Sequence, residues 1–219
     1  MPELGFIFDW DGVIVDSSTL HEKSWEALAE EVALPLPKNH FKQGFGKRNE
    51  VIIPEVLRWS SDPEKIKVWG DRKEKLYRQF VKSSGIQVLD GMRGFLEEMQ
   101  MHQIPAVIGT STARENIELA FQQLGIESFF QGAICAENVT RGKPDPEVFL
   151  KGAELLHYPP AQCVVFEVST HGIKAARIGG MKAVAIKTSQ TAADLTRAGD
   201  HILFDSPKEL TIRSIVELM

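Results

Sequence analysis

The feature that most constrains the fold is the alternation of short, apolar, β-rich runs with longer stretches that have a helical pattern. Such alternation predicts a parallel sheet with helices on both faces, a doubly wound, Rossmann-like α/β core. The expected strands are Leu4–Phe8, Ala106–Gly109, Gly132–Cys135, Cys163–Phe166, Ala183–Ile186 and a sixth at His201–Phe204. The expected helices between the later strands are Met92–Met101, Glu115–Leu124, Pro146–Leu156 and Gly172–Ile178.

One interval breaks this rhythm. Between Asp16 and Ser84 the sequence has amphipathic helical patterns and no convincing strand, and this interval is too long for a simple crossover. It predicts a helical cap inserted after the first strand and standing over the carboxyl edge of the sheet. We therefore expect an α/β core of residues 1–16 and 85–219 and a helical cap of residues 17–84.

Composition limits the classes of partner. The 219 residues are 43% hydrophobic and 25% charged, with a formal charge of −5, as in a soluble globular protein. This mild acidity gives no field that attracts nucleic acid or anionic membranes, so a phosphate-bearing ligand would have to be captured locally by a metal and a few cations. No run approaches the roughly 20 apolar residues of a membrane span, and two cysteines make a disulfide framework improbable. A cytoplasmic monomer or weak dimer is the expectation.

The first expected strand leads into two carboxylates and a glycine, Asp9, Asp11 and Gly12, at the edge where open parallel sheets bind ligands. Residues i and i+2 of an extended segment share a face, and two close carboxylates both stay ionised only beside a cation. A divalent metal on Asp9 would leave Asp11 to exchange a proton, and Gly12 lets the backbone turn without obstructing the pocket. A carboxylate nucleophile would form an acyl phosphate. The alternative is that the pair merely caps a helix or ends a strand.

Further polar groups follow the later strands in order. Thr110, Ser111 and Thr112 offer hydroxyls and backbone N–H groups for a phosphoryl oxygen, Lys143 offers a fixed cation, and Glu167 offers a second metal ligand. Each also fits an ordinary role as a helix cap, a solvated lysine or a loop charge. Their appearance at successive strand ends favours a phosphotransfer site.

These motifs resemble the haloacid dehalogenase superfamily, and within it the β-phosphoglucomutase-like phosphatases, over nearly the whole chain. FDWDGVIVDS is similar to the first family motif, and a second aspartate separates phosphate chemistry from dehalogenation. The resemblance implies magnesium, with Asp9 as nucleophile and Asp11 as acid/base and as a metal ligand through its carbonyl. It also implies phosphate binding by Thr110 and charge stabilisation by Lys143, which lies in GKPDPEVF.

The fourth motif departs from the family. FEVSTHGIKAARIGGM has Val168 where the family places a magnesium-binding aspartate, and valine offers no ligand. Three outcomes are open: Glu167 takes over, water fills the position with weaker affinity, or catalysis is lost.

The cap carries the evidence on specificity. His21 and Trp25 lie in a stretch that resembles the first cap helix of β-phosphoglucomutase, where the matching histidine lies near the acid/base. His21 also fits an ordinary helix-surface imidazole. Lys73 matches a substrate-facing cap lysine. FGKRNE resembles the specificity loop, with Asn49 at the position of the mutase's distal-phosphate arginine and Arg48 one residue early.

The uncertain second anchor favours hydrolysis of a phosphomonoester, a sugar phosphate by resemblance, over mutase chemistry. Three rival interpretations remain. Ser111 in GTSTA imitates a hydrolase nucleophile elbow but lacks its second glycine, and Gly44-Phe45-Gly46 is too weak for a dinucleotide site. The serious rival is a catalytically impaired protein that binds a phosphorylated ligand or a partner, supported by Val168.

Overall fold

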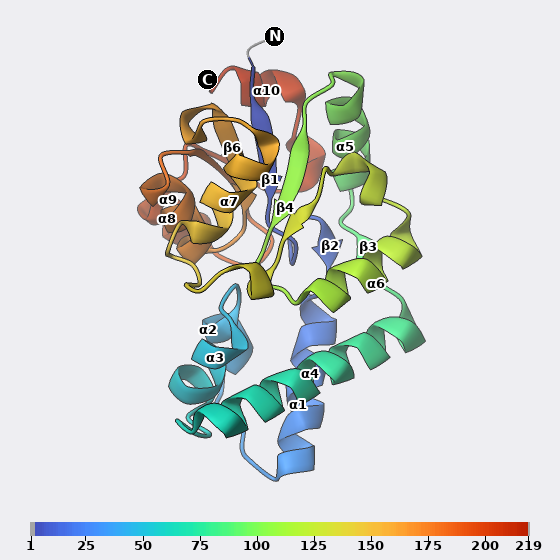
Figure 1. The fold of residues 1–219 in the computed structure, drawn as a ribbon, viewed down its shortest axis with the longest axis vertical. Coiled ribbons are helices and arrows are strands. Elements are labelled where there is room, and N and C mark those ends of the chain that lie inside the picture. Colours follow the sequence, from blue (N-terminus) through green and yellow to red (C-terminus); the bar gives the residue numbers. More distant parts are fainter. Residues whose placement is uncertain (1–2, 219) are drawn as a thin grey trace.

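The computed structural model describes residues 3–218 and contains a six-stranded, wholly parallel sheet (Figure 1). Its order is β5-β4-β1-β6-β7-β8. The strands are β1 (Gly5–Phe8), β4 (Ala106–Gly109), β5 (Ala133–Ile134), β6 (Cys163–Glu167), β7 (Lys182–Ile186) and β8 (Ile202–Phe204). The predicted doubly wound α/β fold with an inserted helical cap is confirmed.

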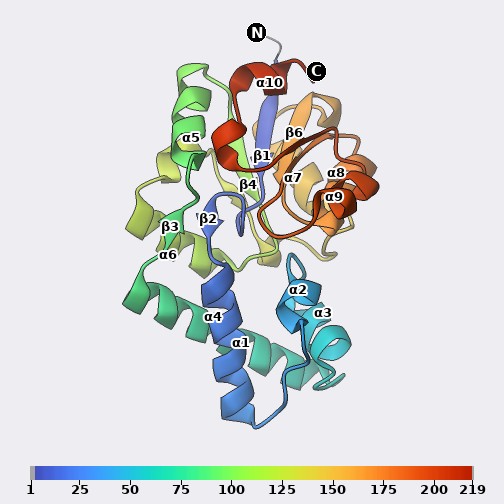
Figure 2. The ribbon, with the colours of Figure 1, turned by 180° about the vertical axis from the view of Figure 1, so that it is seen from behind.

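Alternate residues of β1 serve two cores, because successive side chains of a strand point to opposite faces. Phe6 and Phe8 enter one apolar cluster, and Ile7 enters the other. The first cluster is covered by α5 (Met92–Met101), α6 (Arg114–Leu124) and α10 (Ile212–Val216). The second is covered by α7 (Glu147–Leu156), α8 (Thr170–Ile178) and α9 (Ala192–Ala198), which Figure 2 shows together on one side of the sheet. Short 3-10 turns lie at Glu127–Phe129, Ala136–Asn138, Pro160–Gln162 and Pro207–Glu209.

The cap lies beyond the carboxyl ends of the sheet strands (Figure 1). It consists of α1 (Ser18–Val32), α2 (His40–Gly44), α3 (Asn49–Val51), a π-helical segment (Ile52–Leu57) and α4 (Pro63–Ser84). Asp62 begins α4 by accepting a hydrogen bond from the backbone N–H of Glu64 at 2.9 Å. A separate apolar cluster that includes Trp25, Leu28 and Ile53 holds these helices together.

A two-stranded antiparallel ribbon lies at the junction of cap and core, and the sequence did not predict it. β2 (Val15–Asp16) pairs with β3 (Gln87–Val88), so the two chain connections between cap and core are hydrogen-bonded to each other. Strands of two residues are too short to produce a periodic pattern, which explains the omission.

The strand order places a topological switch at β1. From β1 the chain proceeds to β4 and β5 on one side and then to β6, β7 and β8 on the other. The crevice at the carboxyl end of a strand where the order reverses is the usual ligand site of such sheets. The ends of β1, β4 and β6, with the cap above them, therefore define the place to look for function.

Phe166 tests the importance of the aromatic core beneath this crevice. Its ring is fully buried and stacks on the ring of Phe8, with 4.4 Å between the ring centroids. It meets the ring of Phe6 edge-on, with 5.0 Å between the centroids. We expect Phe166→Ala to lower the free energy of unfolding by about 3–5 kcal/mol, measured by urea denaturation. Met101→Ala, at a side chain that is 75% exposed, should change it by less than about 0.5 kcal/mol. Equal effects of the two substitutions would contradict this account of the core.

Candidate active site

A buried lysine joins the ends of β1 and β6. The Lys143 ammonium lies 3.0 Å from Oδ1 of Asp9, the residue after β1, and 2.6 Å from Oε1 of Glu167, the last residue of β6. All three side chains are at most 5% exposed. The predicted nucleophile and the predicted cation are therefore in direct contact.

Glu167 is held by donors on both of its oxygens. While Oε1 binds Lys143, Oε2 accepts the backbone N–H groups of Val168 at 2.9 Å and Ser169 at 3.0 Å and also the Ser169 hydroxyl. This packing requires Gly172 in α8, because a Cβ there would lie 1.8 Å from Oε1. In this arrangement Glu167 orients Lys143, and its role as a metal ligand stays a prediction.

The electrostatics of this cluster leave Asp9 short of positive charge. Burial, followed by the charge of Glu167, raises the pKa of Asp9 to about 7, because Lys143 compensates only in part. Burial alone would lower the pKa of Lys143, but its two carboxylate partners outweigh burial and raise it. Lys143 is thus a permanent cation, and Asp9 would be held ionised at neutral pH by one further cation nearby.

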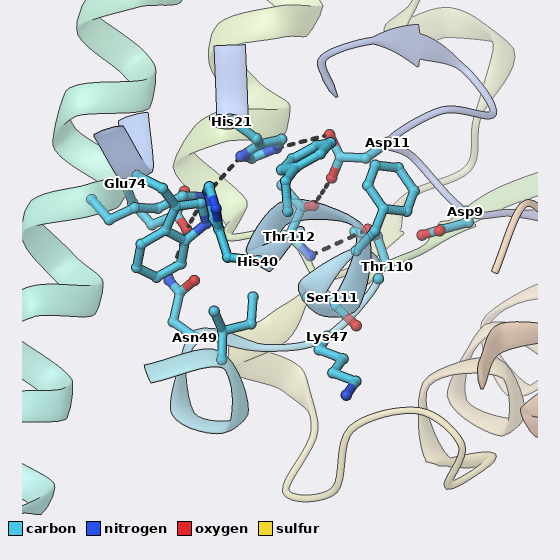
Figure 3. Close-up of a pocket in the computed structure, with 17 residues that line it drawn as sticks. Asp9, Asp11, His21, His40, Lys47, Asn49, Glu74, Thr110, Ser111 and Thr112 are labelled. Atoms are coloured by element: carbon cyan, nitrogen blue, oxygen red, sulfur yellow. Dashed lines mark hydrogen bonds and ion pairs between the residues drawn. The ribbon is translucent and has the colours of Figure 1, made fainter. Parts of the chain in front are cut away.

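Asp11 has the opposite character. Its Oδ1 accepts from the Ser17 hydroxyl. Oδ1 also lies 3.1 Å from Nε2 of His21, and Oδ2 accepts from the Thr112 hydroxyl (Figure 3). Burial opposes ionisation, yet His21 and these hydroxyls outweigh it and hold the pKa of Asp11 well below its usual range. As the structure stands, Asp11 is an ionised base.

The contacts of His21 define its tautomer. Nδ1 lies 2.7 Å from the ammonium of Lys73, which can only donate, so Nδ1 accepts and Nε2 carries the proton directed at Asp11. The ring also stacks on Tyr77 at 4.0 Å. His21 and the 4%-exposed Lys73 thus extend from the cap toward the predicted acid/base.

The loop after β4 is the segment that the sequence predicts to bind phosphate. Thr110 is buried, and its hydroxyl oxygen accepts the backbone N–H of Thr112 at 3.2 Å. Gly12, on the facing loop, has a φ of +79°, and a Cβ there would approach Phe45 and Val168 at 3.2–3.3 Å. A larger residue at position 12 would therefore be strained and crowded.

A pocket of about 650 Å³ of empty space connects these groups to the cap (Figure 3). Its lining includes seven of the predicted site residues, Asp9, Asp11, His21, Asn49, Lys73, Thr110 and Ser111. Lys143, Glu167 and Gly12 are not among its lining residues. Arg48 is directed elsewhere, since its guanidinium donates to the carbonyl oxygens of Val139 at 3.2 Å and Thr140 at 3.5 Å.

Several lining residues were not singled out from the sequence. They are His40, Lys47, Glu74 and the apolar side chains Phe41, Phe45 and Ile52. His40 is informative because Nδ1 faces the Pro37 carbonyl at 3.1 Å and so carries the proton. Its Nε2 is then a buried acceptor that has no partner within the described chain. Phe45 and Lys47 lie in FGKRNE, the stretch that resembles the specificity loop, but no motif marks His40, so only the coordinates reveal its place in the pocket.

The donor set fits a magnesium ion held by few protein oxygens. The described residues contain no cluster of three His, Cys, Asp or Glu side chains spaced to hold a metal, and Val168 is fully buried among apolar neighbours. Magnesium commonly binds through one or two carboxylates, a substrate phosphate and several waters. The uncompensated charge on Asp9 matches that requirement.

Gly172→Ala tests the packing of Glu167 at the start of α8. The added methyl group would collide with the carboxylate, so we expect a loss of about 1–3 kcal/mol in the free energy of unfolding, measured with urea. The matched control is Gly94→Ala in α5, where a Cβ meets nothing within 4 Å. That substitution should stabilise the helix by up to about 1 kcal/mol. If Gly94→Ala destabilises the protein as much as Gly172→Ala does, the collision with Glu167 is not the cause of the loss.

Asp9→Asn tests the strain on the nucleophile. The folded state raises the pKa of Asp9 from 3.8 to about 7, so folding opposes ionisation and wild-type stability is lost as the pH rises through this window. With a chelator present, we expect the variant to melt several degrees above the wild type at pH 8. The two melting temperatures should converge at pH 4, and a lower melting temperature for the variant at pH 8 would contradict the charge assignment.

Comparison with known proteins agrees with this geometry. A family model described as haloacid dehalogenase-like hydrolase matches residues 6–186. The chain is 36% identical over 98% of its length to the chloroplastic 5-amino-6-(5-phospho-D-ribitylamino)uracil phosphatase of Arabidopsis thaliana, of which it spans 55%. It is 28% identical to the phosphorylated carbohydrates phosphatase of Thermotoga maritima, over 81% of this chain and 82% of the relative.

The solved structures agree as well. The crystal structure of β-phosphoglucomutase from Clostridium difficile superposes with a TM-score of 0.86 at 25% identity, covering 100% of this chain and 97% of the other. The predicted relationship to β-phosphoglucomutase-like phosphatases is confirmed. From the family match and the shared fold it follows that the chain belongs to the haloacid dehalogenase-like hydrolase family.

Proposed function

We propose that the protein is a magnesium-dependent phosphatase that hydrolyses a small phosphorylated metabolite through an aspartyl-phosphate on Asp9. The contact of 3.0 Å between Asp9 and the buried Lys143 ammonium, at the base of a pocket lined by Thr110 and Ser111, carries this proposal. The named phosphatases among its relatives support the same reaction class.

The chemistry divides between two carboxylates. Asp9 attacks phosphorus, the bond to the leaving oxygen breaks, and Asp11 gives that oxygen a proton. A phosphate dianion entering beside Asp11 favours its protonated form, since like charges raise the pKa of a carboxyl group. Once ionised, Asp11 removes a proton from water, which attacks phosphorus and releases phosphate from Asp9. Lys143 and the Thr110 hydroxyl stabilise the charge on the phosphoryl oxygens.

Magnesium would be held by the Asp9 carboxylate and the Asp11 backbone carbonyl, with Glu167 as the predicted third ligand and Val168 contributing none. When bound, it would neutralise charge on the phosphate. Val168 leaves most of the coordination to water and to the substrate, so we propose a weak magnesium affinity rather than a loss of catalysis.

The cap favours hydrolysis over mutase chemistry. A mutase must hold two phosphates, but Arg48 donates to carbonyl oxygens of the core and Asn49 donates to Glu74 at 2.8 Å. Lys47 is the one cation of the specificity loop that lines the pocket. A single such lysine leaves the distal end of the pocket poorly suited to a second phosphate.

The pocket wall indicates the class of leaving group. Trp25, Phe41, Phe45 and Ile52 form an apolar wall, while the acceptor on His40 suits a hydroxyl or N–H donor. We propose a phosphorylated sugar or sugar alcohol that carries a flat, less polar group. The substrate named for the Arabidopsis relative, a phosphorylated ribitylamino uracil, has this combination.

The location and the oligomeric state of the protein are less directly constrained by the structure than its reaction. Within residues 3–218, no helix has the length and apolar character needed to cross a bilayer. A cytoplasmic location and a monomeric or weakly dimeric state stay predictions. The rival in which the chain only binds a phosphorylated ligand is supported by Val168 alone.

A screen of phosphorylated metabolites with and without magnesium tests the function. We expect magnesium-dependent release of phosphate, reduced at least about a thousandfold by Asp9→Asn. Val168→Asp should lower the magnesium concentration for half-maximal activity by about tenfold or more, because it adds a hard oxygen ligand. If Val168→Asp leaves activity and magnesium dependence unchanged, Val168 is not at the metal site. If the wild type turns over no phosphate ester, the binding-protein interpretation replaces this one.

A further inference from the structure

A second polar cluster connects the cap to the core at a distance from the reacting groups. Its centre is Glu74 in α4, whose side chain is 16% exposed. Oε1 accepts from Asn49 at 2.8 Å and from the Lys73 ammonium at 3.0 Å, and Oε2 accepts from Asn116 at 2.6 Å. Asn116 belongs to α6 of the core and is 1% exposed.

The bond between Glu74 and Asn116 is costly to leave unmade. A buried amide or carboxylate that loses its partner keeps the full cost of its desolvation. Asn116 is further fixed by Arg78 of α4, which donates to its Oδ1 at 2.9 Å, so both functional atoms of its amide face the cap. Donors surround Glu74, and they outweigh its burial and lower its pKa to about 2.

From Glu74 a continuous chain of hydrogen bonds runs to the predicted acid/base. Lys73 binds Glu74 and Nδ1 of His21, and Nε2 of His21 is directed at Asp11. Asp11 in turn accepts from Thr112, on the loop just before α6. The chain therefore starts and ends at the same part of the core and crosses between cap and core twice, once at Asn116–Glu74 and once at His21–Asp11.

The geometry of this circuit leads us to propose that Glu74 and Asn116 are positioning residues, which set the cap so that Lys73 and His21 hold Asp11 for catalysis. The inference rests on the proposed phosphatase function. In this role neither Glu74 nor Asn116 touches the phosphate. Each acts on Asp11 indirectly, through Lys73 and His21.

Two features distinguish this role from simple adhesion between cap and core. Glu74 neutralises Lys73, so that ammonium stays beside the imidazole as a donor and fixes the protonated nitrogen of His21 toward Asp11. A displacement of α4 at Asn116 would be transmitted to His21, because each link of the circuit is a direct contact of 3.1 Å or less. A misplacement of about 1 Å in a catalytic group can cost roughly a hundredfold in rate.

An exchange of the carboxylate and the amide between positions 74 and 116 tests the proposal. Asn116→Asp alone opposes two carboxylates where 2.6 Å now separates a donor from an acceptor. We expect it to lower kcat by about tenfold or more, with a smaller change in KM. In the double variant Glu74→Gln/Asn116→Asp, the glutamine oxygen can still accept from Lys73 and Asn49 while its amide donates to the new carboxylate. Because the carboxylate that neutralises Lys73 then lies one residue farther away, we expect partial recovery, with kcat at least about threefold above that of Asn116→Asp.

The matched control is Arg72→Gln, two residues before Glu74 in α4. Arg72 binds Glu31 of α1 at the surface of the cap and has no contact with the circuit. It should leave kcat unchanged. Melting temperatures of all variants separate positioning from unfolding, because a structural role alone would make the loss of activity follow the loss of stability.

The nitrogen-15 NMR spectrum of the histidines gives a readout that needs no turnover. His21 should show an unprotonated Nδ1 and a protonated Nε2, a pattern altered by Asn116→Asp and restored in the double variant, with His21→Gln identifying its signals. The proposal fails if the double variant is no more active than Asn116→Asp, or if Asn116→Asp changes neither kcat nor the spectrum. If the wild type hydrolyses no phosphate ester, the proposed function fails, while the spectra still decide whether Glu74 and Asn116 position His21.

Discussion

The site depends on one buried ammonium group placed between two carboxylates. Lys143 binds the residue after β1 and the last residue of β6, so it joins adjacent strands at the topological switch. Its burial requires a carboxylate partner, because an unpaired ammonium would be an uncompensated charge in a dry environment. Gly172 has no Cβ, and this leaves room for the carboxylate of Glu167, which in turn binds Lys143. The packing at the start of α8 thus helps to fix the position of the Lys143 ammonium.

The cap applies the same physical rule on the other side of the pocket. Lys73 is 4% exposed and is neutralised by Glu74, much as Lys143 is neutralised by Asp9 and Glu167. The two lysines have different surroundings, however. Lys143 contacts the nucleophile directly, whereas Lys73 reaches Asp11 through the imidazole of His21. The two carboxylates after β1 therefore differ in their surroundings: burial and Glu167 raise the pKa of Asp9, whereas His21 and two hydroxyls outweigh burial and lower the pKa of Asp11.

The sequence predicts the fold and the local motifs well, because both depend on short-range patterns. Apolar runs locate the six sheet strands to within two residues, and the DxD pair, Thr110 and Lys143 follow strands as expected. Contacts between distant residues escape such patterns. Asn116 and Glu74 are 42 positions apart, each in an ordinary amphipathic helix, and no spacing rule links them. The β2–β3 ribbon and the free acceptor of His40 escape for the same reason, since each is defined by a partner far away or by a cavity.

Arg48 shows a further limit of sequence inference. A basic residue in a loop expected to bind substrate is naturally assigned to a substrate anion, yet its guanidinium donates to carbonyl oxygens of the core and pairs with Glu50. The charge of a residue in the sequence indicates which partners suit it chemically. It does not indicate which of those partners lies within reach in the folded protein. The neighbouring Lys47, with the same charge, lines the pocket instead.

Val168 fits this charge balance. An aspartate there would add a carboxylate to a cluster in which Asp9 and Glu167 already share the buried ammonium of Lys143. Valine instead packs as a fully buried member of the core against Gly12, so the loop keeps its shape without a metal ligand. The chain therefore needs a divalent cation less to relieve repulsion among its own groups. What remains of that need is concentrated on Asp9, whose pKa of about 7 makes the nucleophile the group most sensitive to a nearby cation.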